Sequence, residues 1–523
     1  MHHLAQFDHQ HAWHPFTQMR DWLKTEPIVI VEGHGASLRD VRGRTYLDAN
    51  SSIWTNLHGH KHPKINAGIQ RQLGKIAHSS ALGLANEPAS LLAQKLVRAA
   101  KCQPGGRGSN PELPLRSSGA VRKRSKDLRS GQPAELVKVF FSDDGSTAVE
   151  VALKMAYEYT RRLGRTSKPR FLSLAGAYHG DTVGAVSLGH IPLFHQAYSG
   201  LLFKTDRAMS PYCYRCPFNR AKPDRADARH YRKCQWECIE KLESRFRAQK
   251  KRGNPYAAFV FEPLMQGAAG MIPQPAGWLR LATETARAHG ALLIADEVMT
   301  GFGRTGTGQL VEPNSSSASQ AGSSGRRRQS YRSSSAPDPG LFACQHEDVR
   351  PDFLALAKGL TGGYVPMAAT LTTQAVFDAF LGDYAEFKTF FHGHSFTANQ
   401  IGAAAALASL EILSSPGSLR ARNNLERALH DELKRLWDYP EVGDIRQVGL
   451  IAAVELVKTW RTREPFDVRD RVGIRVCELM AKRGVLTRPV GNVIVLMPPY
   501  CTTREQVHTM VTALGESVSE LFS

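Results

Sequence analysis

The chain has 523 residues, which is enough to bury a large core, and its formal net charge is +19. Residues 101–136 and 312–339 contribute +5 and +2 of this charge, and no nucleic-acid-binding motif accompanies them. The basic excess therefore indicates solvated surface and argues against a nucleic-acid partner. No apolar run reaches the roughly 18 residues of a membrane helix, and the N-terminus does not resemble a secretory signal. We expect a cytoplasmic protein that binds no membrane.

The first part of the chain, residues 1–100, places apolar segments between many turn residues, as in Asp40-Val-Arg-Gly-Arg-Thr-Tyr-Leu-Asp48. This pattern predicts short strands joined by tight turns. Residues 103–134 then become rich in Gly, Pro, Ser, Arg and Lys, and residues 312–339 have a similar low-complexity composition. Such sequence cannot bury enough apolar surface to fold. We therefore expect a disordered basic insertion at 103–134 and a second disordered insertion at 312–339.

The middle of the chain alternates apolar strand-like runs with helical periodicity. Strands are predicted at 136–141, 170–174, 257–262 and 291–296, and a helix follows Ser142-Asp-Asp-Gly. Apolar strands interleaved with helices predict an α/β fold with a mostly parallel sheet that is buried on both faces. Long helical segments are expected from about 397 to 436, followed by an α+β region from about 440.

Two residues at the ends of apolar runs are candidates for chemistry. Asp296 ends the run Ala291-Leu-Leu-Ile-Ala, and ligands of open α/β sheets bind beyond the carboxyl ends of strands. An aspartate there could keep a pyridinium nitrogen protonated, or it could simply cap the next helix. Lys358 closes a similar run, Leu354-Ala-Leu-Ala, and is followed by glycines. A partly desolvated lysine has a lowered pKa and suits Schiff-base chemistry, although a lysine at a strand end can also extend to solvent.

A possible anion site lies at the start of the helix that follows the first central strand. Gly145 and Ser146 would offer backbone N–H groups and a hydroxyl at the helix N-terminus, which is the arrangement that binds phosphate. An ordinary helix N-cap is the alternative. The sequence Gly301-Phe-Gly-Arg-Thr-Gly306 fits the dinucleotide-binding pattern, but it does not directly follow a strand and no helix follows it. We therefore do not expect a dinucleotide site.

Three further segments are compatible with a ligand site or with an ordinary surface role. Tyr178 could stack on a planar cofactor, Ser395 could contact a phosphate, and Arg488 could pair with a carboxylate. A separate cluster of four cysteines has the spacings C-x2-C and C-x3-C, in Cys213, Cys216, Cys234 and Cys238. Four thiolates could hold a zinc ion, and a reduced, metal-free surface subdomain is the alternative.

Taken together, these segments resemble the class III pyridoxal-phosphate (PLP) aminotransferases. The resemblance is carried by Leu293-Ile-Ala-Asp-Glu-Val-Met-Thr-Gly-Phe-Gly-Arg-Thr-Gly306 and by Lys358-Gly-Leu-Thr-Gly-Gly363, and it covers the chain apart from the two insertions. It implies a fold type I PLP transferase. The large PLP-binding domain would span 136–400, interrupted by 312–339, and a smaller α+β domain would be formed by 1–100 and 401–523.

Within this class the chain resembles the branch that acts in biotin synthesis, through His11-Ala-Trp-His-Pro-Phe16, Ser51-Ser-Ile-Trp54 and Ala177-Tyr-His-Gly-Asp181. The resemblance implies transfer of an amino group to 8-amino-7-oxononanoate to give 7,8-diaminononanoate, with S-adenosylmethionine or lysine as donor. Phe16 and Ile53 stand where many members that use S-adenosylmethionine have Tyr and Trp, which puts the donor in question. Another ω-aminotransferase, acting on ornithine, 4-aminobutyrate or a diamine, is the alternative.

The resemblance also implies residue roles. Lys358 would form the Schiff base and Asp296 would bind the pyridine nitrogen, while Gly145 and Ser146 would bind the phosphate. Tyr178 would stack on the ring and contact substrate. His394 and Ser395 would reach the phosphate of the neighbouring subunit, so the active unit would be a homodimer with shared sites. The remaining substrate contacts would come from Phe16, Trp54, Gly393 and Arg488, and no metal would be part of the site.

Overall fold

The computed structural model describes residues 1–101, 135–306 and 341–523. The two predicted insertions, 103–134 and 312–339, lie outside the described residues. Among the helices of the described ranges, none has both the length and the apolar character needed to cross a membrane.

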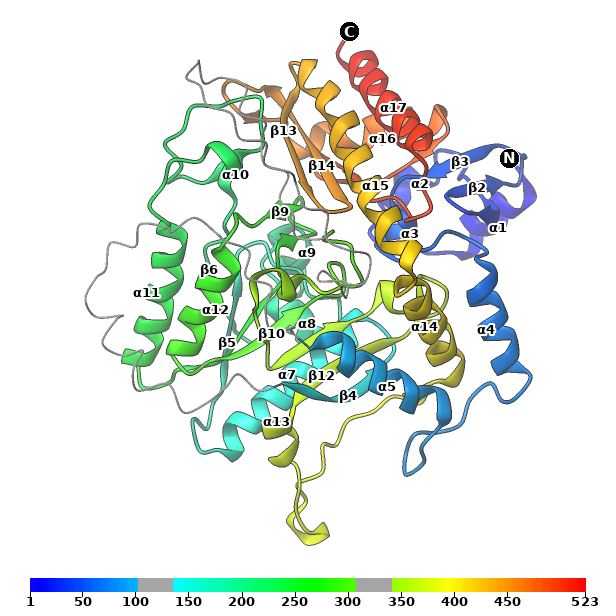
Figure 1. Ribbon diagram of the computed structural model, residues 1–523. Coiled ribbons are helices and arrows are strands. Elements are labelled where there is room, and N and C mark those ends of the chain that lie inside the picture. The colour runs from blue at the N-terminus through cyan, green and yellow to red at the C-terminus, as the bar shows by residue number, and fades with distance from the viewer. Residues whose placement is uncertain (102–134, 307–340) are drawn as a thin grey trace, which may run out of the picture.

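A central sheet of seven strands organises the middle of the chain (Figure 1). Its order is β4 (Leu136–Ser142), β12 (Ala368–Thr373), β11 (Phe353–Leu356), β10 (Leu292–Asp296), β7 (Tyr256–Phe261), β5 (Arg170–Leu174) and β6 (Asp206–Ala208). All neighbours pair in parallel except β12, which is antiparallel to both β11 and β4. The four strands predicted from the sequence are present within one residue of their expected limits, and the α/β class with a mostly parallel sheet is confirmed.

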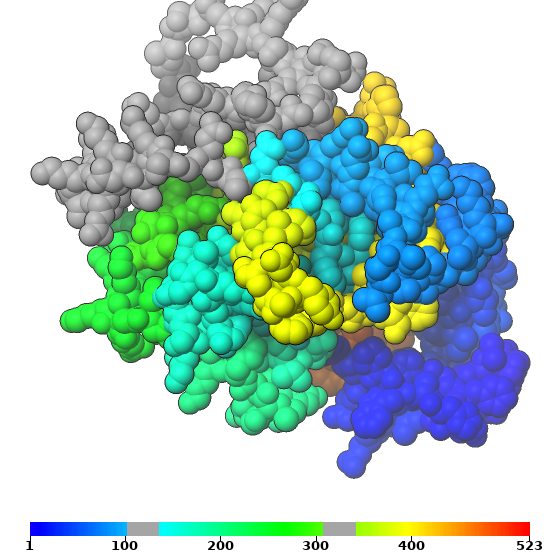
Figure 2. All heavy atoms as spheres, turned by 90° about the horizontal axis from the view of Figure 1, so that it is seen from below, coloured from blue at the N-terminus to red at the C-terminus, as the bar shows by residue number. Residues whose placement is uncertain are grey.

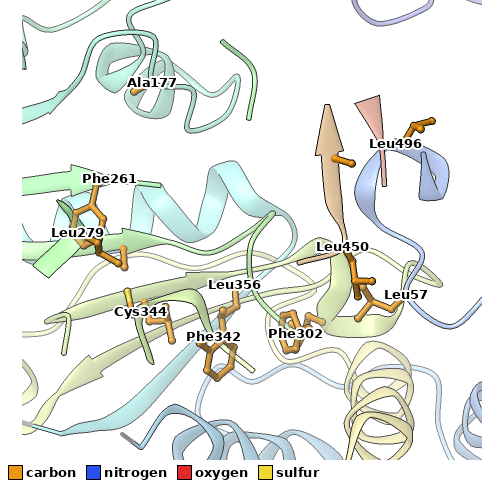
Figure 3. Packing of buried hydrophobic residues seen from close by; sticks show 14 of the residues in the cluster. Leu57, Ala177, Phe261, Leu279, Phe302, Phe342, Cys344, Leu356, Leu450 and Leu496 are labelled. Atoms are coloured by element: carbon orange, nitrogen blue, oxygen red, sulfur yellow. The ribbon is translucent and has the colours of Figure 1, made fainter. Parts of the chain in front are cut away.

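Apolar side chains project from both faces of this sheet, and helices cover them on each face. Ala258, Val260 and Ile294 pack in one cluster with the helix α7 (Gly145–Arg162). Their neighbours on the same strands pack in a second cluster with α12 (Trp278–Ala288). Figure 3 shows part of this second cluster, where Leu279 of α12 lies beside Phe261 of β7. Because both faces are covered by helices, the strands read as continuous apolar runs.

The N-terminal part contains the predicted strands, but it also contains helices that were not expected. The strands β1 (Ile30–His34), β2 (Ser37–Asp40) and β3 (Thr45–Asp48) form antiparallel pairs, and β3 also pairs with β16 (Val485–Leu486) near the other end of the chain. The prediction of strands and turns alone for 1–100 is wrong, because α1 (His3–His11), α4 (Pro63–Leu73) and α5 (Glu87–Ala100) also lie there. α4 and α5 bury one side against α14 (Gln400–Leu413), and this packing stabilises them as helices.

The C-terminal part is α+β, as expected. A second sheet has the order β13 (Val442–Val448), β14 (Ile451–Thr459), β18 (Val493–Leu496) and β17 (Pro489–Val490), with β15 (Glu464–Pro465) paired to β14. The helices α15 (Pro416–Leu433), α16 (Val472–Lys482) and α17 (Arg504–Phe522) lie in the same region of the molecule (Figure 1). The expected helical stretch at 397–436 is thus divided between α14 and α15, and the division of the chain into domains stays a prediction.

Shorter elements connect these parts. They are the helical turns α2 (Met19–Trp22), α3 (Ser51–Trp54), α9 (Pro192–His195), α10 (Ala228–Tyr231) and α13 (Gln374–Asp378), with the helices α8 (Val183–Leu188) and α11 (Glu237–Lys251), the hairpin β8 (Met265–Gln266) and β9 (Ile272–Pro273), and the 3-10 turns η1 (Gln196–Tyr198), η2 (Cys213–Arg215), η3 (Ala343–Glu347), η4 (Lys358–Thr361), η5 (Tyr384–Glu386), η6 (Lys434–Asp438) and η7 (Val468–Asp470).

The four clustered cysteines line one small cavity between η2 and the start of α11, and all four are free thiols. Burial raises the pKa of Cys213 to about 12 and that of Cys238 to about 11. Within the described ranges, no group of three or more His, Cys, Asp or Glu side chains is arranged so that it could hold a metal ion. Burial thus favours the neutral thiol at Cys213 and Cys238.

Candidate active site

A cavity of about 490 Å³ opens at the carboxyl ends of the central strands. Six of the residues predicted for the site line it, namely Trp54, Gly145, Ser146, Tyr178, Asp296 and Lys358. The other five, Phe16, Gly393, His394, Ser395 and Arg488, are not among its lining residues. The cavity thus brings together residues that are far apart in the sequence.

The sheet register explains why Asp296 and Lys358 meet. β10 and β11 are parallel neighbours, and Asp296 pairs with Ala355. Asp296 is the last residue of β10, and Lys358 follows shortly after the end of β11. Both side chains therefore leave the sheet at the same edge, where ligands of such sheets bind. Lys358 begins η4 with a φ of 45°, a left-handed conformation that is uncommon for a residue with a side chain.

Asp296 is held by two hydrogen bonds and is almost completely buried. Nδ1 of His179 lies 2.8 Å from Oδ2, and the backbone N–H of Val298 donates to Oδ1 over 3.1 Å. Burial opposes the charged form of His179, but the hydrogen bond to Asp296 and the negative charges of Asp296 and Glu262 together outweigh it and raise the pKa of His179. The pair places a negative carboxylate, oriented by a histidine, in the wall of the cavity.

Lys358 is partly buried in the cavity wall, and its Nζ lies 4.9 Å from the centre of the Trp54 ring. Burial lowers the pKa of Lys358, and the negative charges of Asp296 and Glu262 oppose this shift only in part. A lysine with a lowered pKa holds more of its amine in the neutral, nucleophilic form at neutral pH.

Glu262 is a residue of the site that the sequence interpretation missed. It follows the last residue of β7 and lines the cavity. Its Oε1 accepts from the N–H of Tyr178 at 3.3 Å, and its Oε2 accepts from the N–H of Gly267 at 2.8 Å. Burial raises the pKa of Glu262 to about 7. The signal was present in the sequence, because Glu262 ends an apolar strand in the same way as Asp296.

The start of α7 provides an anion-binding end to the cavity. Asp144 caps the helix by accepting from the N–H of Thr147 at 2.9 Å, and Gly145 and Ser146 follow it at the cavity wall. A Cβ on Gly145 would lie 2.7 Å from Cγ1 of Val298, so the glycine allows the helix start to pack directly on the loop after β10. The free N–H groups of a helix N-terminus and the partial positive charge there favour a phosphate.

Tyr178 links the cavity to a group of aromatic side chains. Its Oη donates to Oδ2 of Asp181 at 2.6 Å, and its ring is stacked with His195 at 6.4 Å between centroids. Phe194 contacts Tyr178 edge-on and also contacts Phe16 edge-on, at 6.4 and 5.2 Å. Phe16, which is 57% exposed, therefore lies next to residues of the cavity without lining it.

Arg488 also lies outside the cavity lining, beside Phe16. It is exposed, and its Nη2 donates to the backbone oxygen of Phe16 at 3.1 Å. The predicted contact of Arg488 with a substrate carboxylate stays a prediction.

Gly393, His394 and Ser395 lie on the segment between η5 and α14, which lies at the surface in Figure 2 (yellow). Nδ1 of His394 is 3.4 Å from a carboxylate oxygen of Asp143, and the backbone oxygen of Ser395 accepts from His78 at 2.9 Å. None of these three residues lines the cavity of its own chain, so their roles stay predictions.

The cavity has the features needed to hold pyridoxal phosphate. Three buried polar atoms of lining residues have no hydrogen-bond partner among the described residues: Nε1 of Trp54, Nε2 of His179 and Oγ1 of Thr300. An amine, a carboxylate and a helix N-terminus lie around the same cavity. This set matches an aldehyde, a basic ring nitrogen and a phosphate, respectively.

Comparison with known proteins identifies the family. The model of the family Aminotransferase class-III matches residues 19–312 and 339–518. A protein of Geobacter sulfurreducens named adenosylmethionine-8-amino-7-oxononanoate aminotransferase is 44% identical over 98% of this chain and 97% of its own length. A protein of the same name from Methanocaldococcus jannaschii is 36% identical over 99% of this chain and 98% of its own length.

Solved structures agree with these matches. The crystal structure of adenosylmethionine-8-amino-7-oxononanoate aminotransferase from Methanocaldococcus jannaschii has a TM-score of 0.79 and 34% identity, and the match covers 99% of this chain and 98% of that one. An amine transaminase from an uncultivated Pseudomonas species in its PLP-bound form has a TM-score of 0.77 and 29% identity, over 97% and 98% of the two chains. The fold is that of the fold type I PLP transferases, and the chain belongs to the class III aminotransferases, which depend on pyridoxal phosphate.

Proposed function

We propose that this enzyme transfers an amino group to 8-amino-7-oxononanoate and forms 7,8-diaminononanoate, a step of biotin synthesis. The main support is the near full-length similarity to relatives whose name gives this reaction. The cavity adds chemical support, because a partly buried lysine and a buried aspartate line it together. This combination suits amino transfer on an aldehyde cofactor.

In this proposal the cofactor is held by Lys358, Asp296, the α7 N-terminus and Tyr178. Pyridoxal phosphate supplies the aldehyde that carries the amino group and the ring that withdraws electrons from the reacting carbon. Asp296, oriented by His179, would hold the hydrogen on the ring nitrogen, and Gly145 and Ser146 would receive the phosphate. Nζ of Lys358, with its lowered pKa, would move a proton between the amine-bearing carbon of the substrate and the aldehyde carbon of the cofactor.

The amino donor is proposed to be S-adenosylmethionine or lysine, and different observations support each. The names of the relatives contain adenosylmethionine. Phe16 and Ile53 replace the Tyr and Trp of many members that use S-adenosylmethionine, which favours lysine. Phe16 and Trp54 lie near or in the cavity, so a donor is expected to contact this side of the site.

We further propose a homodimer in which His394 and Ser395 complete the site of the neighbouring subunit. The support is that these residues lie on a surface segment with large exposed apolar side chains, and not in the cavity of their own chain. Tyr384, Phe387 and Phe391 of this segment are 91%, 65% and 70% exposed. An apolar surface of this kind is typical of a protein interface.

The test is an assay of the purified protein with 8-amino-7-oxononanoate and either donor, with formation of 7,8-diaminononanoate as readout. We expect product with one donor, loss of product in Lys358→Ala, and unchanged activity in Lys458→Ala, which alters an exposed lysine that is paired with Glu464. Absence of product with both donors would refute the proposal. Activity on ornithine, 4-aminobutyrate or a diamine instead would favour the second candidate, which the similarity to an amine transaminase supports.

A further inference from the structure

The segment that carries Trp54 into the cavity has an unusual backbone. Ser51, Ser52, Ile53 and Trp54 have φ values of 48°, 48°, 62° and 69°, so all four residues of α3 are left-handed. None of them is glycine, and Ile53 is β-branched. Left-handed backbone is unfavourable for such residues because Cβ comes too close to the carbonyl oxygen. The surrounding structure must therefore stabilise this turn.

Asp48 provides hydrogen bonds that a left-handed turn requires. Its Oδ1 accepts from the backbone N–H groups of Ser52 at 3.0 Å and Asn50 at 3.3 Å. Its Oδ2 accepts from the hydroxyl of Ser52 at 3.0 Å. Asp48 is only 2% exposed and Ser52 is exposed, so the carboxylate end of these bonds is shielded from water.

His60 completes the arrangement by binding the same carboxylate. Nε2 of His60 lies 3.0 Å from Oδ2 of Asp48, and Nδ1 lies 3.0 Å from the side-chain amide nitrogen of Asn56. The amide oxygen of Asn56 accepts from the N–H of Gly59, so its nitrogen is the group that faces His60. The amide donates to Nδ1, and the imidazole hydrogen is therefore on Nε2, where it is donated to Asp48.

The rest of the turn is packed tightly against the loop that follows Lys358. A Cβ on Gly363 would lie 2.7 Å from the backbone nitrogen of Asn56, directly after the turn. The hydroxyl of Ser51 donates to the backbone oxygen of Met497 at 2.7 Å. At the end of the turn, Trp54 reaches the cavity wall, with its ring 4.9 Å from Nζ of Lys358. A change in the turn would thus displace Trp54 relative to Lys358.

We propose that Asp48 is a positioning residue, which holds the left-handed turn Ser51–Trp54 and thereby fixes the Trp54 ring beside Lys358 in the substrate cavity. Asp48 does not line the cavity, whereas Trp54 at the end of the turn does. Burial opposes the charge of Asp48, but the hydrogen bonds from His60 and Ser52 outweigh it and lower its pKa, so the carboxylate is charged at neutral pH. The effect on substrate rests on the proposed function, whereas the effect on Trp54 does not.

The test compares Asp48→Asn with Asp40→Asn. Asp40 is a matched control, because it also ends a strand of the N-terminal sheet, is 2% exposed and accepts several hydrogen bonds, but its partners Arg42, Arg44 and Tyr46 do not line the cavity. The first readout is the fluorescence of Trp54 in the apoenzyme, obtained as the difference between each variant and the same variant with Trp54→Phe. We expect Asp48→Asn to shift the Trp54 emission to longer wavelength, and Asp40→Asn to leave it unchanged.

The second readout is kinetic. Asp48→Asn is expected to raise KM for the amino acceptor roughly threefold to tenfold, with kcat within about twofold, because a weakened hydrogen-bond set displaces a binding side chain and not Lys358. If Asp48→Asn does not fold, Ser52→Ala removes one bond to the carboxylate and is expected to give a smaller shift in the same direction. An unchanged Trp54 emission in the folded variant, or an equal shift in Asp40→Asn, would overturn the proposal. The fluorescence readout decides this even if the proposed acceptor is wrong.

Discussion

At the scale of single residues, the state of Lys358 depends on the charges around it. Burial lowers its pKa, and the carboxylates of Asp296 and Glu262 oppose that shift. The two acids differ, because Asp296 is paired with His179, whereas burial raises the pKa of Glu262 to about 7. Glu262 therefore changes its charge near neutral pH, within range of the amine. Its ionisation is expected to be coupled to that of Lys358.

Replacing Glu262 by Gln should lower the pKa of Lys358. The substitution removes a negative charge that favours the protonated amine, so the neutral amine should form at lower pH. The measurement is the rate at which the apoenzyme captures pyridoxal phosphate as a function of pH, followed by absorbance. We expect the midpoint of this profile to move to lower pH. The capture rates of the variant and the parent enzyme should differ most above pH 7, where Glu262 of the parent enzyme is ionised.

Glu297→Gln is the matched control for this prediction. Glu297 is also buried with its pKa raised to about 7, but its oxygens accept from the backbone N–H groups of Ala343 and Cys344. For both acids the folded state favours the protonated form, so the contribution of each to stability is highest below pH 4.5 and decreases as the pH rises to about 7. Both variants should lose part of this dependence in thermal unfolding. A profile for pyridoxal phosphate capture that moved equally in both variants would contradict the assignment to Glu262.

Several residues of the site could be recognised in the sequence, and others could not. Asp296 and Lys358 end apolar runs, and the same signal was available for Glu262. His179 could not be identified as the partner of Asp296, because their contact joins residues 117 positions apart and depends on which strands are neighbours. Ser395 was a candidate phosphate contact from the sequence, but the role of His394 and Ser395 at the neighbouring subunit came from the resemblance alone, and the place of this segment on the surface follows from tertiary structure.

At the scale of elements, the central strands were predictable because burial on both faces makes them continuously apolar. α4 and α5 were not predicted, although Ile65, Leu92 and Leu96 are buried at their contacts with the rest of the protein. The many turn residues in the first 100 positions led to a prediction of short strands and turns in place of these helices. α3 could not have been predicted at all, because no local preference of Ser, Ile or Trp leads to left-handed backbone; the turn depends on Asp48, Met497 and Gly363.

The start of α7 leads to a prediction for cofactor binding. Gly145→Ala would place a Cβ 2.7 Å from Cγ1 of Val298, so the helix start must move away from the loop after β10. We expect the Kd for pyridoxal phosphate to rise roughly tenfold, which corresponds to about 1.4 kcal/mol. The measurement is a fluorescence titration of the apoenzyme with pyridoxal phosphate.

Gly417→Ala serves as the control for this substitution. Gly417 also lies in the first turn of a helix, α15, and no atom lies within 4 Å of the position of an added Cβ. It should leave the Kd unchanged and keep or slightly raise the thermal stability, because alanine favours helix more than glycine does. A Kd that is equal in Gly145→Ala and the parent enzyme would show that the α7 start does not carry the phosphate.

At the scale of the whole molecule, the proposed homodimer gives each residue of the site a defined origin. Lys358 and Asp296 line the cavity of their own chain, whereas Ser395 does not line it. The proposed role of Ser395 therefore requires a second subunit, and defects in Lys358 and Ser395 would fall in the same site when they are on different chains, so that the other site stays intact. This separation can be measured with hybrid dimers that carry two different tags.

A hybrid of Lys358→Ala and Ser395→Glu subunits should regain activity that neither homodimer has. Glutamate at position 395 would repel the phosphate of the neighbouring site, so the Ser395→Glu homodimer should be inactive. In the hybrid, one site combines an intact Lys358 with an intact Ser395, and the other site carries both defects.

The control hybrid joins Lys358→Ala with Asp296→Asn, whose altered residues both belong to the cavity of their own chain, and it should contain no intact site. Activity in the first hybrid and none in the control is the expected result. An active Ser395→Glu homodimer, or two inactive hybrids, would mean that Ser395 does not complete the neighbouring site.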